Sequence, residues 1–107
     1  MNLKNILELA DKAIAENNHV YAKSLIEKEL KLNPNIFELN FKLGLLHHIL
    51  GDLNKALNFY EKTTLLNPNF SPAYCNLGII YDKLDNRTLA IKYYQNAIEK
   101  DPKNFKA

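Results

Sequence analysis

Apolar residues recur along the chain at spacings of three and four, the periodicity of helices that bury one face. One stretch with this spacing comprises Leu43, Leu46, Ile49 and Leu50, and the next comprises Ala56, Phe59, Tyr60 and Leu66. No window shows the sustained alternation that is typical of strands. The pattern therefore predicts an all-α chain with about six helices, near residues 3–16, 20–32, 37–50, 53–66, 71–84 and 87–100.

Turn signals divide these helices into pairs with a constant period. Three of the four prolines are evenly spaced, at Pro34, Pro68 and Pro102, and each follows Asn or Asp. Proline ends a helix because its ring disfavours the α conformation of the residue before it. Polar pairs recur midway at the same interval and predict tight turns: Asn17-Asn18, Gly51-Asp52 and Asp85-Asn86. Before the fifth helix, Ser71 is predicted to be an N-cap with Pro72 at the first helical position.

Residues 35–68 and 69–102 are identical at matched positions where two paired helices must touch. These identities are Asn35/Asn69, Leu43/Leu77, Gly44/Gly78, Leu50/Leu84, Ala56/Ala90, Tyr60/Tyr94 and Pro68/Pro102. Gly44 and Gly78 are predicted to let the partner helix approach closely, with Tyr60 and Tyr94 filling the space beside it. The first period is weaker, and keeps Leu9, Ala10, Ala22, Ile26 and Pro34.

This pattern resembles the tetratricopeptide repeat, a 34-residue helix–turn–helix unit. Its positions are matched in the third period by Tyr74, Leu77-Gly78, Tyr81, Ala90, Tyr94, Ala97 and Pro102. The second period departs from it at Asn40, His47 and Thr63, and the first at Ala10, Ala13 and Glu29. The resemblance implies a right-handed superhelical solenoid, a single domain over residues 1–107. Its repeats would span residues 1–34, 35–68 and 69–102, with residues 103–107 as a tail too short to form a capping helix.

The resemblance also implies that the first helix of each repeat lines a concave groove for a protein partner. The groove positions would form an apolar strip of Phe41, Leu45, Ile49 and Ile79. Polar residues would surround it: Lys42, His48, Asn76, Asp82 and Lys83. An apolar floor with a polar rim suits an extended peptide or an amphipathic helix. The alternative is that Phe41 and Leu45 only pack between neighbouring repeats.

Some members of the family act as co-chaperones and grip the carboxylate at the end of chaperone tails. Lys42 and Asn76 have suitable chemistry for such a clamp, but the other clamp positions hold Leu7, Asp11 and Pro72. The carboxylate of Asp11 would repel a second carboxylate, so a chaperone tail is not the expected ligand.

A second hypothesis concerns the last helix, because a fourth repeat would begin near Phe105 and the sequence stops at Ala107. An uncovered apolar patch marks an interface or an aggregation liability. Self-association would then use Leu89, Ile91, Tyr93, Tyr94, Ile98 and Phe105. The remaining possibility is that the chain is a fragment whose missing segment supplies the cap.

Composition narrows the classes of partner and the compartment. The 107 residues are 47% hydrophobic and 24% charged, with a formal net charge of +2 and a single arginine, Arg87. This balance disfavours nucleic-acid or anionic-membrane binding. One cysteine excludes an intramolecular disulfide, and no apolar run approaches membrane-spanning length. Glu8 and Asp11 interrupt the stretch that a signal peptide needs. We therefore expect a cytoplasmic protein.

No catalytic, metal or cofactor site is predicted, so the expected protein is a non-enzymatic scaffold. His47 and His48 are adjacent and point about 100° apart on a helix, which does not suit a shared metal. His47 is expected in the core, and His48 in the groove near Asp82. Cys75 is expected to line the groove without a base beside it. Lys23, Glu27 and Lys31 stand at the spacing of ion pairs on a solvated helix face.

Overall fold

The computed structural model describes residues 2–105, although for residues 104 and 105 only the backbone is described. Over this range the chain is helical and contains no strand. Its elements are α1 (Leu3–Ala15), α2 (His19–Leu32), α3 (Phe37–Ile49), α4 (Leu53–Leu66), α5 (Ser71–Lys83), α6 (Arg87–Lys100) and a closing 3₁₀ turn, η1 (Pro102–Phe105). The predicted all-α solenoid is confirmed, and every predicted helix boundary is correct to within one residue.

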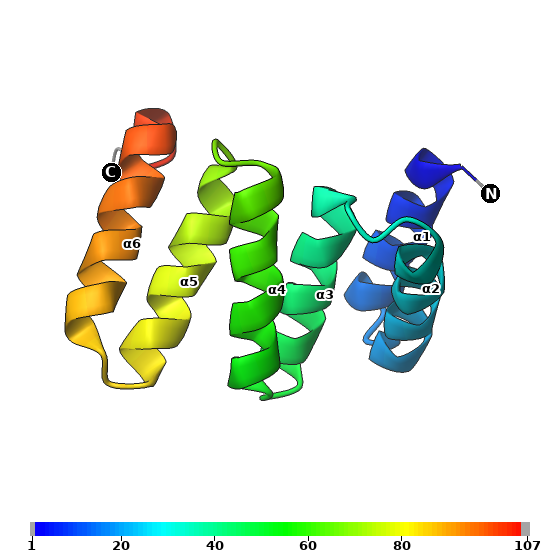
Figure 1. Cartoon of the computed structure of the whole chain (residues 1–107). Helices are drawn as coiled ribbons and strands as arrows, with labels where there is room; N and C mark the ends of the chain where they lie inside the picture. Colours follow the sequence, from blue (N-terminus) through cyan, green and yellow to red (C-terminus); the bar gives the residue numbers. More distant parts are fainter. Residues whose placement is uncertain (1, 106–107) are drawn as a thin grey trace.

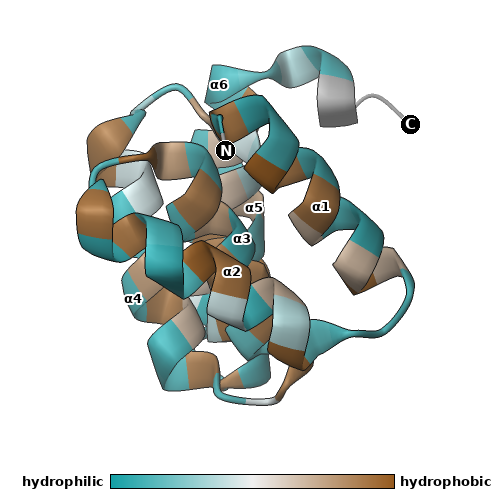
Figure 2. Cartoon of the chain, turned by 90° about the vertical axis from the view of Figure 1, so that its right-hand side faces the viewer, coloured by the Kyte–Doolittle hydropathy of each residue, from teal (hydrophilic) through white to brown (hydrophobic). Residues whose placement is uncertain are grey.

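The helices stand side by side in antiparallel pairs, with the two ends of the chain at opposite ends of the row (Figure 1). The body measures 39 × 26 × 25 Å. Apolar residues recur along all of the helices and do not gather in one of them (Figure 2). One core cluster joins α1, α2 and α3, and a second joins α4 and α5. The first pair therefore buries apolar residues against α3, and α4 of the second pair does so against α5 of the third.

The turn inside each pair has the same backbone geometry in all three copies. Its first residue adopts a left-handed conformation, with φ of 61° at Asn17, 85° at Gly51 and 61° at Asp85. The next residue caps the second helix through its side chain, which accepts a hydrogen bond from a backbone N–H three residues on; these caps are Asn18, Asp52 and Asn86. A polar residue or glycine followed by Asn or Asp meets both requirements.

The connections between pairs are held by side chains that bind the carbonyl of a periodic proline. The Nδ2 of Asn40 donates to the Pro34 carbonyl at 3.1 Å, and the hydroxyl of Tyr74, at the matching position one period later, donates to the Pro68 carbonyl at 2.8 Å. Asn40 departs from the apolar residue that the repeat prefers, yet it is buried. Its amide also donates to the carbonyl of Ile36, so the buried polar group is satisfied.

The predicted capping role of Ser71 is wrong. The N-cap of α5 is Phe70, and Ser71 already belongs to the helix. The buried Ser71 hydroxyl donates instead to the Ala97 carbonyl near the end of α6, at 3.2 Å. A local sequence pattern cannot reveal this bond, because its acceptor lies on another helix.

The two helical glycines allow the close approach that the sequence predicts. A Cβ on Gly44 would lie 2.7 Å from the Tyr60 ring, and one on Gly78 would lie 2.8 Å from the Tyr94 ring. Such distances are too short for any Cβ, so the tyrosine could not keep its place beside alanine. The α3–α4 and α5–α6 pairs therefore share one packing unit, a glycine on the first helix under a tyrosine on the second.

Candidate functional site

Side chains of α1, α3 and α5 meet across one face of the stack, which we call the inner face. Lys42 on α3 forms an ion pair with Asp11 on α1. His48, also on α3, lies 3.1 Å from Lys83 on α5, measured from Nε2 to Nζ. These two contacts link the first helices of consecutive pairs. The residues predicted to form a groove are thus carried on neighbouring helices.

The apolar strip of the inner face divides into residues with different environments. Leu45 and Ile79 occupy matching positions of α3 and α5, and both are half-buried. Ile49 is 47% exposed. Phe41 packs edge-on against Phe70 in the turn before α5, with ring centroids 5.0 Å apart. Three aliphatic side chains of the strip are therefore partly open to solvent, whereas Phe41 also packs between successive pairs.

A buried hydroxyl lies beneath this strip. Tyr60 is fully buried against Phe41, with ring centroids 5.5 Å apart. Its hydroxyl has no hydrogen-bond partner among the residues that the structure describes. Burial raises the pKa of Tyr60, and the Asn76 side chain on α5 partly offsets this effect. The Tyr60 phenol is therefore neutral at physiological pH and serves as packing.

The polar rim is largely engaged within the chain. Asp11 neutralises the ammonium group of Lys42, which is the charge that a ligand carboxylate would otherwise meet. The predicted neighbour of His48 was Asp82, but the structure gives Lys83 as its hydrogen-bond partner. Because lysine can only donate, the Nε2 of His48 accepts and the ring is neutral. Burial and the charge of Lys83 lower the pKa of His48. Asp82 and Lys83 themselves are exposed.

The residues of the hypothesised self-association surface also differ in placement. Ile91 and Ile98 are 50% and 45% exposed and lie two helical turns apart, hence on one face of α6. Tyr93 stacks on Tyr81 of α5 at 5.5 Å, while Tyr94 lies against Gly78. Leu89 is half-buried, and the side chain of Phe105 lies outside the described residues. The exposed part of this surface is therefore the pair of isoleucines.

The residues considered for chemistry occupy packing positions. His47 is buried, as expected, and its ring is stacked on Phe59 at 5.4 Å with an interplanar angle of 4°. Cys75 is half-buried, and burial raises the pKa of its thiol, which opposes formation of a reactive thiolate. Among residues 2–105, no group of three or more His, Cys, Asp or Glu side chains is placed to hold a metal ion.

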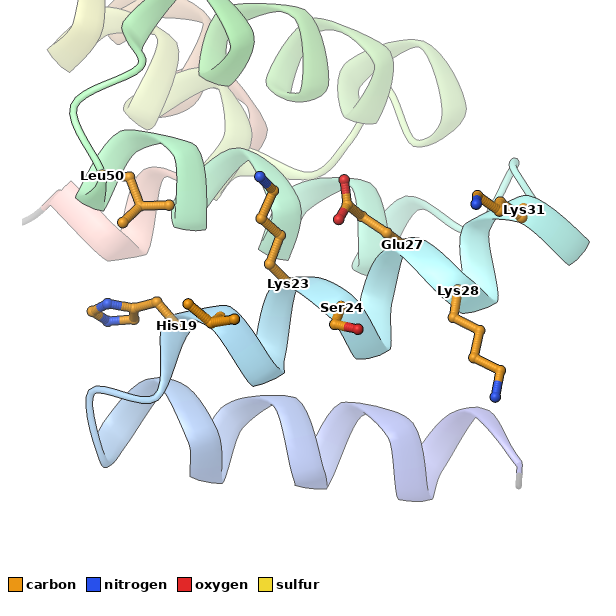
Figure 3. Close-up of a pocket in the computed structure, with 8 residues that line it drawn as sticks. His19, Lys23, Ser24, Glu27, Lys28, Lys31 and Leu50 are labelled. Carbon is orange, nitrogen blue, oxygen red and sulfur yellow. The ribbon is translucent and has the colours of Figure 1, made fainter.

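A hollow that sequence reasoning missed lies on the other side of the stack, between α2 and the end of α3 (Figure 3). Its volume is about 490 Å³, and it is lined by His19, Val20, Lys23, Ser24, Glu27, Lys28, Lys31 and Leu50. The predicted surface ion pairs of Glu27 with Lys23 and Lys31 are absent from the part of the chain that the structure describes. The 34-residue period could have revealed the hollow, because it aligns the charged Lys23 with the apolar Leu57.

Paired helices repeated at a constant period, stacked with an inner face, define a helical-repeat solenoid, a class that presents extended binding surfaces. Tetratricopeptide repeat models match residues 37–70 and 71–104, each starting two residues after the predicted repeat boundary. The chain belongs to the tetratricopeptide repeat family. Proteins of this family generally act as non-catalytic interaction scaffolds.

Solved structures share this fold. A MamA structure has a TM-score of 0.85 and 29% identity over 94% of this chain and 59% of its own. YrrB, described as having an unusual peptide-binding site, has a TM-score of 0.83 and 24% identity over 95% and 53%. The first repeat domain of Spaghetti (RPAP3), bound to the HSP90 peptide SRMEEVD, has a TM-score of 0.86 and 21% identity over 94% and 79%.

The chain spans about six-tenths of the length of the MamA structure that it matches. A search of the curated proteins gives no match to the sequence. Among the described residues, no helix is both long and apolar enough to span a bilayer.

Proposed function

We propose that this chain is a non-catalytic interaction module that binds an apolar peptide or an amphipathic helix of a partner protein on its inner face. The observation that carries the proposal is the strip of Leu45, Ile49 and Ile79. Leu45 and Ile79 repeat the same position on adjacent helices, so their spacing suits a ligand that crosses both. Peptide binding by YrrB and by the Spaghetti domain, which share the fold, supports this class of ligand.

The charges beside the strip favour an apolar anchor over a carboxylate clamp. Asp11 already pairs with Lys42, and a ligand carboxylate would have to displace it. The hydrogen bond from Lys83 leaves the His48 ring neutral and without strong attraction for an anion. Recognition would therefore rest on aliphatic contacts, with Asn76 able to orient a peptide backbone by its amide.

The test begins with a peptide selected from a random library on the immobilised protein, whose affinity is then measured by fluorescence anisotropy. The double variant Leu45→Ser/Ile79→Ser removes two half-buried anchors and is expected to weaken binding at least tenfold. Phe41 is left intact because it packs against Phe70 and Tyr60. The matched control is Leu32→Ser/Leu65→Ser, two exposed leucines at the ends of α2 and α4. Unchanged affinity in a Leu45/Ile79 variant that circular dichroism shows to be folded would refute the proposal.

Self-association through α6 is the second candidate. Leu57 on α4 occupies the position of Ile91, and it packs against the core cluster that joins α4 to the α5 residues Leu77 and Ile80. A helix pair thus already covers this position once within the chain, and a second copy could cover Ile91 in the same way. Sedimentation should then show a dimer or larger species that Ile91→Lys/Ile98→Lys dissociates. A monomer at millimolar concentration would exclude this function.

A further inference from the structure

Two adjoining hollows form one groove on the side of the stack away from the inner face, and we call it the outer groove. The first, of about 490 Å³, lies along α2 and reaches Leu50. The second, of about 280 Å³, extends between α2 and α4 and is lined by Pro34, Asn40, Leu43 and Phe59, among others. Both are lined by Glu27 and Lys31, so the two hollows adjoin along α2. The groove follows the boundary between the first and second repeats.

One residue that lines the outer groove, Lys23, differs in chemistry from its counterpart at the next repeat boundary. Leu57 on α4 is partly buried against the core cluster that joins α4 and α5 and includes Leu77 and Ile80. The matching residue of the first repeat is Lys23. An ammonium group cannot be buried in such a place without a partner. The Lys23 side chain instead rises from α2 toward α3, on the same side as Glu27 (Figure 3).

Positive charge predominates along the groove. Lys23, Lys31 and Lys62 line it, and Glu27 is the only carboxylate among its lining residues. None of these three lysines forms an ion pair within the described chain, whose ion pairs are Lys42–Asp11 and Lys55–Asp52. Lys28 also borders the first hollow, although its side chain extends toward the far side of α2 (Figure 3). The groove thus offers three unpaired cationic groups on two helices.

Apolar surface alternates with these charges. Val20 is 83% exposed and Leu50 is 55% exposed at one end of the groove. Phe59 and Leu30 are half-buried at the other end. The side chains of Val20 and Leu50 are open to solvent, whereas the apolar residues of the two core clusters are buried. They would lose this exposure on contact with aliphatic side chains of a ligand.

We propose that the outer groove binds an acidic peptide segment of a partner protein that also carries aliphatic side chains. Its carboxylates would pair with Lys23, Lys31 and Lys62, and its aliphatic groups would cover Leu50 and Val20. A nucleic acid fits less well, because Glu27 would face its phosphates and no arginine lines the groove. The ring of Phe59 is already stacked on His47 and is not free to stack on a base.

The probe is a synthetic dodecapeptide of Asp and Glu with a leucine at every fourth position. Its comparison ligands are the analogue with Asn and Gln in place of the acids, and an oligothymidylate of equal charge. We expect the acidic peptide to bind, with amide NMR shifts confined to α2, α4 and the groove residues Asn40, Leu43 and Leu50. The neutral analogue should bind at least tenfold more weakly. Affinity should also fall as salt is raised, because the groove is open to solvent and its charges are screened.

The decisive variant is Lys23→Glu/Lys31→Glu, which should reduce affinity for the acidic peptide at least tenfold. Its control is Lys92→Glu/Lys100→Glu, which changes two exposed lysines on α6 with the same spacing along the helix and should leave affinity unchanged. If charge reversal prevents folding, Lys23→Gln/Lys31→Gln replaces it, with an expected loss of at least threefold. Equal affinity of the groove and control variants, shifts on the inner face, or tighter binding of the oligothymidylate would each overturn the proposal.

A further variant tests why the groove is open. Lys23→Leu introduces the side chain that Leu57 provides at the next repeat boundary. It should therefore close the first boundary, raise the melting temperature and abolish peptide binding. Retention of full affinity would contradict the role given to Lys23. The proposal is independent of binding on the inner face, because Leu45→Ser/Ile79→Ser should leave the affinity of the acidic peptide unchanged.

Discussion

Two repeat boundaries have matching residue positions but different chemistry. One lies between the second and third repeats, and the other lies between the first and second. At the former, the Tyr81 hydroxyl donates to the Glu61 carboxylate at 3.2 Å, and the Tyr81 ring stacks on Tyr93. At the latter, the matching residues are Glu27, His47 and Phe59. The ring stack of His47 on Phe59 is preserved at 5.4 Å, but no hydrogen bond joins His47 to Glu27 within the described residues.

The comparison shows which features recur from repeat to repeat and which differ. The left-handed turn and the helix cap are present three times, and the stacked ring pair twice. The residue at one matching boundary position differs between the copies: it is Leu57 at one boundary and Lys23 at the other. One fold thus holds a closed apolar boundary and an open charged one, and we place the outer groove at the open one.

The largest effect is expected where the two kinds of helix pair are interchanged. In the second pair, Gly44 lies under Tyr60; in the first pair, the matching residues are Ala10 and Ile26, both fully buried. Gly44→Ala forces the new Cβ against the ring and should cost about 1–3 kcal/mol of unfolding free energy. Tyr60→Ile should cost about 2–4 kcal/mol through the cavity that it leaves.

The double variant Gly44→Ala/Tyr60→Ile recreates the pairing of the first repeat and should be at least about 1 kcal/mol more stable than the sum of the single changes predicts. Urea denaturation measures all three free energies. Gly51→Ala with Tyr60→Ile is the control, because Gly51 has a positive φ but no neighbour within 4 Å of a new Cβ. That pair should be additive, and additivity for Gly44 as well would contradict the packing unit inferred from the structure.

A smaller effect is expected from converting the first boundary to the chemistry of the second by His47→Tyr. The new hydroxyl could donate to Glu27 as Tyr81 does to Glu61, which is worth about 1 kcal/mol at neutral pH. The variant should also reduce the pH dependence of stability. Burial, followed by the charge of Lys23, lowers the pKa of His47, with Lys55 adding to this effect and Asp52 and Glu27 opposing it.

The sign of that dependence follows from the direction of the shift. Between the lowered pKa of folded His47 and the ordinary value of 6.5, the unfolded chain binds more protons than the folded chain. The stability that neutral His47 contributes is therefore fully present above pH 6.5 and is lost as the pH drops through this window. Burial lowers the pKa of His48 as well, so His48→Asn separates the two contributions. Chemical denaturation from about pH 7 to about pH 5 should show a shallower decline for His47→Tyr; an unchanged slope would rule out titration of His47 as its source.

The helices and turns could be predicted from the sequence because the signals that define them are local. Asn17, Gly51 and Asp85 each act within their own turn, and the prolines act on their immediate neighbours. Phe41 shows where such reasoning stops. Its spacing predicts a place on the inner face, but its partner Phe70 lies beyond the whole of α4, in a turn with no helical register. Which groove residues also pack inside the stack depends on contacts of this kind.

The outer groove was missed for a related reason. Lys23, Glu27 and Lys31 have the spacing of surface ion pairs on one helix, and a single helix carries no information on what lies opposite. The structure places the α3–α4 pair there, and it contributes Leu50, Phe59 and Lys62. Only the alignment of Lys23 with the packed Leu57 could have suggested an open boundary, and that alignment gains meaning once the contacts of Leu57 are known.

The smallest effect is expected in the turn that all three pairs share. A left-handed φ strains the backbone of any residue with a side chain, and the strain is smaller for Asn than for Asp. Glycine adopts this φ without such strain. Asp85→Gly should therefore raise the unfolding free energy by about 0.5–1 kcal/mol, and Gly51→Asp should lower it by a similar amount, both measured by urea denaturation. The neighbouring caps Asn86 and Asp52 remain in place, so each change reports on the turn alone. Asn17→Gly should gain less than Asp85→Gly, since the amide of Asn tolerates this conformation best. If Asp85→Gly is neutral or destabilising, the three turns are not energetically equivalent, and the periodic symmetry of the backbone does not extend to its energetics.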